Sequence, residues 1–153
     1  MKFNNKEEMI EKIGEEFLWN IISEYVENDV QGVRESVIEN VGNIDLDMIE
    51  QIASLNILES EEFLVTGFSE HEHKIAVEYE MPAIIMADSA DKKILIRVQT
   101  ACTGTVEVPD LDAFDWQAVD FENMHLPEIL SYRHLANILS VSYEYTEADL
   151  CQW

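Results

Sequence analysis

Ile75-Ala-Val-Glu-Tyr-Glu-Met81 alternates large apolar residues with small or charged ones. Such alternation is typical of a β-strand that buries one face and leaves the other in water. Pro82 follows directly and has no backbone N–H for a strand ladder, so we expect an edge position or a bulge there. The stretch therefore predicts a sheet with one face against a core.

The residues around this strand extend it into a β-rich region over 61–109. Phe63–Phe68 favours a strand, residues 88–93 favour a turn, and residues 94–108 favour another long strand that Gly104 interrupts. Neighbouring strands with such short connections pair antiparallel. We therefore expect an antiparallel meander of about three to five strands.

Residues 5–58 show the spacing of helices instead. Apolar residues recur three and four positions apart from Met9 to Tyr25, with Asn5 as N-cap, and again from Val30 to Val41. Asp45 can cap a third helix that runs to Leu55. The first third of the chain is thus predicted to be helical.

After the β-rich region, residues 110–125 combine acidic and aromatic side chains and predict a loop, with a short edge strand as the alternative. Pro127 suits the first turn of a helix, and apolar spacing predicts that helix over 127–140. No repeat or linker divides residues 1–153, so a single domain is expected. The fold class is α+β, with the helical third and the C-terminal helix packed on one face of the meander.

The charge balance is the main clue to function. The chain has 32 Asp and Glu against 9 Lys and Arg, a net charge of −23 over 153 residues. Residues 1–60 carry −10, residues 61–110 carry −6 and residues 111–153 carry −7, so no part compensates another. An apolar content of 47% argues against a disordered acidic tail. The acidity therefore belongs to a folded body.

Several partners and locations are disfavoured by this composition. Phosphate contacts need clustered Lys and Arg, but Lys92-Lys93 is the one adjacent pair. Direct binding to nucleic acid or to an anionic membrane is therefore not expected. The first eight residues are polar and acidic, unlike a signal peptide, and Cys102 and Cys151 are too few for a disulfide framework. We expect a cytoplasmic protein.

The leading hypothesis is a non-enzymatic interaction protein that occludes a basic surface of a partner. Antitoxins, immunity proteins and inhibitors that mimic nucleic acid work in this way, with a toxin or a nucleic-acid-binding protein as partner. Interface energy concentrates in aromatic anchors, so Trp116 is expected to be the anchor. The other candidate contacts are acids of the first helix and of the 110–125 loop: Glu8, Glu11, Glu15, Glu16, Asp110, Asp112, Asp115 and Asp120.

Two alternatives stay open. His71 and His73 would share a face of a strand and could bind zinc or nickel in a metal- or ligand-binding domain or a small enzyme, although residues 69–74 also read as a hairpin tip. The chain lacks the nucleophile and phosphate-loop motifs that would nominate catalytic residues, and no cofactor is expected. The third hypothesis is an accessory subunit whose acidity serves solubility alone.

Overall fold

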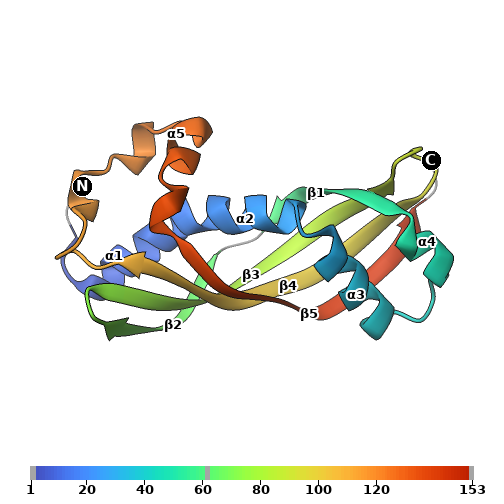
Figure 1. The fold of residues 1–153 in the computed structure, drawn as a ribbon, viewed down its shortest axis with the longest axis horizontal. Helices are drawn as coiled ribbons and strands as arrows, with labels where there is room; N and C mark the ends of the chain where they lie inside the picture. The colour runs from blue at the N-terminus through green and yellow to red at the C-terminus, as the bar shows by residue number, and fades with distance from the viewer. Residues whose placement is uncertain (1–2, 61–62, 152–153) are drawn as a thin grey trace. The chain divides into compact units, whose positions relative to one another are not determined.

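The computed structural model describes residues 3–60 and 63–151. It confirms the α+β prediction: a helical N-terminal part, a five-stranded antiparallel sheet and a short helix near the C-terminus. The strand order is β1-β3-β4-β5, and β2 also pairs with β3 (Figure 1). Among these described residues, no helix is both long enough and apolar enough to cross a membrane.

The helices and strands have the following bounds. The N-terminal helices are α1 Lys6–Ile13, α2 Trp19–Glu27, α3 Val30–Asn40 and α4 Leu46–Glu50, and a π-helical turn, η1 Gly14–Leu18, joins the first two. The strands are β1 Ile52–Ser60, β2 Leu64–His71, β3 Lys74–Ser89, β4 Leu95–Pro109 and β5 Asn137–Cys151. Between β4 and β5 lie η2 Trp116–Ala118, η3 Phe121–Asn123, α5 Leu126–Ser131 and η4 Arg133–Leu135.

The described residues group into two compact units. The first contains residues 3–22, 63–80 and 103–141, and the second contains residues 23–60, 81–102 and 142–151. The long strands β3, β4 and β5 contribute residues to both. The expectation of a single domain stays a prediction.

In the first unit, the helix α1 and the turn η1 pack on the β2–β3 hairpin, which is visible in Figure 1. Asn5 caps α1 as predicted, since its side chain accepts a hydrogen bond from the backbone N–H of Glu8 at 2.8 Å. Gly14 begins η1, and a Cβ there would lie 3.0 Å from the ring of Phe63. Close packing on the hairpin therefore explains a glycine inside this helical segment.

In the second unit, β1 pairs with the second half of β3, from Ile52 opposite Ser89 to Ser60 opposite Ala83. The helix α3 is tied to the sheet by buried hydroxyl groups. Ser36 lies 2.6 Å from Thr146 of β5, and the hydroxyl of Thr146 lies 3.0 Å from that of Thr100 of β4. Buried polar groups need such partners, so this chain of hydroxyls is a satisfied part of the core.

The predicted helix from Asp45 to Leu55, and helical structure to residue 58, are wrong beyond Glu50. The helix α4 ends there and β1 begins at Ile52. Ile52 and Leu55 are buried as expected, but in a strand that pairs with β3. Ile52 and Leu55 are three residues apart, which fits a helix. Pairing with β3 makes the segment a strand instead.

The predicted helix over 127–140 is also too long. It is confirmed only for its first part, because α5 ends at Ser131 and β5 begins at Asn137. Ile138 and Leu139 fitted the helical stripe, but they lie in that strand. A short apolar run fits either period, which is why the sequence pattern extended the helix too far.

Candidate functional site

The predicted acids of the first helix differ in exposure. Glu11 and Glu15 are exposed and lie four residues apart, and no ion pair involves either within residues 3–60 and 63–151. Glu8 is half-buried and accepts a hydrogen bond from the backbone N–H of Asn4 at 3.4 Å. Glu16 is half-buried and lies 3.4 Å from the ammonium group of Lys12. Glu11 and Glu15 are therefore the more accessible pair.

Asp110 is largely buried and has a structural role. It is 9% exposed, and its carboxylate lies 3.0 Å from the ammonium group of Lys6, which also pairs with Glu70 at 2.6 Å. Burial acts to raise the pKa of Asp110, but the hydrogen bonds from Lys6 and from the backbone N–H of Leu111 outweigh it and lower the pKa. This carboxylate fixes the start of the 110–125 loop.

Trp116 does not meet the expectation of an exposed anchor. Its side chain is 1% exposed, and its indole N–H donates to the carbonyl oxygen of Pro109 at 2.8 Å. The ring packs 5.5 Å from Phe17 and 4.8 Å from Phe114, measured between ring centroids. The loop folds back on α1 and η1, so this tryptophan is core, where a partner cannot reach it.

The loop and the α5 region line an open surface hollow of about 470 Å³ in the first unit, which we call the loop hollow. Its apolar side chains include Phe114, Met124 and Tyr132. Its acidic side chains are Asp115, Asp120 and Glu128. The structure thus brings the predicted Asp115 and Asp120 together, whereas Asp112 is exposed outside this lining.

The carboxylate of Asp120 is held in place inside the loop. The side-chain amide of Asn123 donates to it at 2.6 Å and lowers its pKa. Asp120 therefore stays ionised at neutral pH. Glu128 and Tyr132 were not predicted to belong to this site. The loop was expected to end at residue 125, and both residues were assigned to the helix predicted over 127–140, with no reason to expect that they contact the loop.

The two histidines do not share a strand face. His71 ends β2, while Glu72 and His73 form the turn of the hairpin with φ of 44° and 68°. This confirms that residues 69–74 are a hairpin tip and contradicts the geometry on which the metal hypothesis depended. Within the described part of the chain, no group of three His, Cys, Asp or Glu side chains could hold a metal ion.

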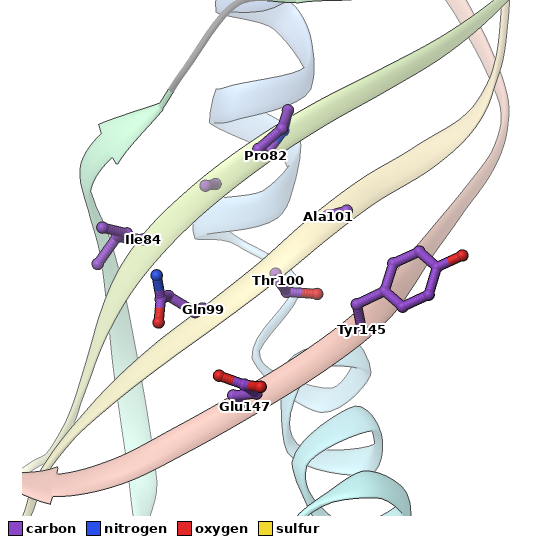
Figure 2. A pocket seen from close by; sticks show the side chains of 8 residues that line it. Pro82, Ile84, Gln99, Thr100, Ala101, Tyr145 and Glu147 are labelled. Carbon is purple, nitrogen blue, oxygen red and sulfur yellow. The ribbon is translucent and has the colours of Figure 1, made fainter.

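A second hollow, of about 380 Å³, lies on the sheet of the second unit. Figure 2 shows its lining on three neighbouring strands: Pro82 and Ile84 of β3, Gln99, Thr100 and Ala101 of β4, and Tyr145 and Glu147 of β5. Glu147 is the one charged residue of that lining. None of these residues was predicted to take part in binding, since none belongs to a recognisable motif, and Pro82 was expected only to mark an edge position or a bulge.

Tyr145 marks a bulge in β5 at the rim of this second hollow. Tyr143 donates a hydrogen bond to Asp29, the N-cap of α3, at 2.6 Å, and Thr146 bonds to Ser36 of the same helix. Both side chains therefore face α3, although regular alternation would place them on opposite faces. The extra residue is accommodated at Tyr145, which has a φ of 55° and is 83% exposed.

The buried thiol offers no reactive group. Burial raises the pKa of Cys102 to about 12, and the nearby negative charge of Asp29 adds to the effect. The thiolate is the nucleophilic form, so this cysteine is inert at neutral pH.

Comparison with known proteins yields no relative. No family model, curated protein or solved structure matches this chain. The function of this chain is therefore inferred from the arrangement of its own residues.

Proposed function

We propose that this chain is a non-enzymatic interaction protein whose acidic surface binds and occludes a basic surface of a partner protein. Partners of this kind include toxins and proteins that handle nucleic acid, and the chain would then act as an antitoxin, an immunity protein or an inhibitor. Its place would be the cytoplasm, where its two cysteines, which are free in the structure, would stay reduced.

The observation that supports this proposal is a large surplus of carboxylates on ordered elements. The chain carries 32 acidic and 9 basic residues. Glu11 and Glu15 are exposed on the helical segment, and Asp115 and Asp120 are exposed in the folded loop. Because folded elements hold these groups in fixed positions, their fields add up over the surface.

The mechanism would be occlusion with electrostatic steering. Carboxylates of this chain would occupy the cationic groove in which the partner binds phosphates. Charge complementarity can raise an association rate constant to about 10⁸ M⁻¹s⁻¹ at low salt, from about 10⁵–10⁶ M⁻¹s⁻¹ for neutral surfaces. Salt would slow that association by screening the exposed charges.

The test is capture of host proteins on the immobilised full chain at about 50 mM and about 500 mM salt. We expect basic proteins at low salt and their loss at high salt. The same capture with Glu11→Gln/Glu15→Gln should recover less of them than capture with Glu35→Gln/Glu39→Gln, a matched pair of exposed acids on α3. Neutral or acidic partners whose binding ignores salt would overturn the proposal and favour a purely solubilising role for the charge.

A further inference from the structure

The loop hollow combines aromatic, apolar and acidic side chains in one open depression of the first unit. Its lining residues come from the 110–125 loop and from the α5 region, which the sequence predicted as two separate elements. A volume of about 470 Å³ lies within the range of cavities that bind small groups. It is large enough to receive a long side chain of another protein.

The aromatic part of the lining is rigidly supported. The rings of Phe114 and Tyr132 lie 6.3 Å apart at 68° to each other. Trp116 lies beneath Phe114, with centroids 4.8 Å apart, and is itself fixed by its hydrogen bond to Pro109. Trp116 is therefore a positioning residue: it holds Phe114 in the wall of the hollow.

The charged part of the lining is entirely negative. Asp115, Asp120 and Glu128 line the hollow, and its lining contains no Lys, Arg or His. Arg133, the residue after Tyr132, lies outside that lining. Carboxylates beside aromatic faces attract an organic cation both by charge and through the ring quadrupole.

We propose that the loop hollow binds an arginine side chain of the basic partner. This inference rests on the proposed function and adds its recognition site. The planar guanidinium group stacks on aromatic rings and donates paired hydrogen bonds to a carboxylate, which suits Phe114, Tyr132 and Asp120. The methylene groups of the arginine would lie along apolar side chains such as Met124.

The direct test needs no partner protein. The isotopically labelled full chain is titrated with N-acetyl-arginine methyl amide and followed by the NMR signals of its backbone amides. We expect saturable shifts in residues 114–120 and at Tyr132, and much weaker shifts with the neutral citrulline compound. Equal shifts with citrulline, equal binding of the lysine compound, or shifts confined to other residues would each overturn the assignment of an arginine site.

Two matched variants then connect the hollow to the partner. Asp115→Asn/Asp120→Asn/Glu128→Gln removes the acids of the lining. Glu35→Gln/Glu39→Gln/Glu50→Gln removes the same charge from exposed positions of α3 and α4. We expect the first variant to lose at least about tenfold more affinity for the captured basic protein than the second. Tyr132→Leu, with its fold checked by circular dichroism, should weaken binding while leaving the net charge unchanged.

The possible failures are distinguishable. If the chain captures no basic protein, the proposed function fails. If it captures one and both neutralised variants weaken binding equally, the proposed function stands and the arginine site is wrong, because charge alone would then explain the affinity.

Discussion

Gly104 lies where β4 and β5 approach each other in the first unit. A Cβ at this position would clash with the backbone oxygen of Ser140 and would lie 2.9 Å from the hydroxyl of Tyr79. That same oxygen accepts a hydrogen bond from Tyr79, and the Ser140 hydroxyl accepts one from the backbone N–H of Thr105. The glycine does not interrupt β4; it allows the two backbones to come together.

Gly104→Ala should therefore destabilise the protein. The methyl group meets backbone atoms, which cannot rotate away, so we expect the free energy of unfolding to fall by about 2 kcal/mol or more. Urea unfolding measures this change. Gly42→Ala is the control, because a Cβ there has nothing within 4 Å, and it should leave stability unchanged or slightly raised. Equal effects at both glycines would contradict the close approach.

Asp88 gives a prediction for low pH. The hydrogen bonds from Lys92 at 2.7 Å and from Ser54 lower the pKa of Asp88 from its ordinary value of 3.8. The folded state therefore takes up the proton less readily than the unfolded state. The stabilisation from this carboxylate is complete above pH 3.8 and is lost as the pH falls through the lower folded value.

The stability difference between the wild type and Asp88→Asn should be constant near neutrality and shrink below about pH 4. Urea unfolding at a series of pH values measures it. Lys92→Gln keeps the carboxylate but removes the ammonium group, so it should reproduce part of the change. A difference that stays constant down to pH 2 would show that Asp88 is not selectively stabilised in its ionised form.

At the scale of elements, the β2–β3 hairpin has a turn whose residues do not suit its backbone. Glu72 and His73 both have positive φ, as a type I′ turn requires, although Asn-Gly is the preferred pair there. His73 also presents its carbonyl oxygen to the backbone N–H of Asp110 at 2.7 Å, which links the turn to the start of the loop.

Glu72→Asn/His73→Gly should stabilise the hairpin by about 1 kcal/mol, because asparagine and glycine both tolerate the left-handed region. The hydrogen bond to Asp110 uses only backbone atoms and is therefore kept. Thermal and urea unfolding measure the gain. His71→Gly is the contrasting change, because glycine weakens a strand, and it should destabilise. A loss of stability in the double variant would mean that the side chains of Glu72 and His73 stabilise the protein by more than their positive φ angles destabilise it.

At the scale of the whole molecule, the net charge of −23 acts on stability as well as on binding. Like charges lie closer together in a compact chain than in an unfolded one, so their repulsion favours unfolding. The ion pairs of the described residues, such as that between Lys6 and Asp110, neutralise only part of the surplus.

Added sodium chloride should therefore raise the melting temperature at neutral pH by roughly a few degrees, because screening relieves the repulsion. Scanning calorimetry between low and about 0.5 M salt measures the shift. A neutralised variant such as Glu35→Gln/Glu39→Gln/Glu50→Gln should show a smaller shift. Melting temperatures that fall with salt would mean that attractive ion pairs dominate.

The sequence predicted the parts of the fold in which the spacing of apolar residues fits only a helix or only a strand. The alternation of residues 75–81 and the caps Asn5 and Asp45 correspond to observed elements. It failed where apolar residues fit two periods, as in Ile52–Leu55, since pairing with β3 is a long-range effect.

For the candidate site, composition predicted the acidic aromatic loop and the acids Asp115 and Asp120. It did not predict that Trp116 would be buried beneath Phe114 or that Glu128 and Tyr132 would meet the loop. Those facts depend on how the loop folds back over the core, which no local pattern records.

The bulge at Tyr145 has a consequence for self-association. β5 stands at the end of the strand order, and the unpaired side of such a strand is a template on which another chain can add. A residue with a φ of 55° in its middle breaks the regular spacing of amide and carbonyl groups that an incoming strand would need. Together with the exposed carboxylates of Glu144 and Glu147, this irregular rim should keep concentrated protein from aggregating edge to edge.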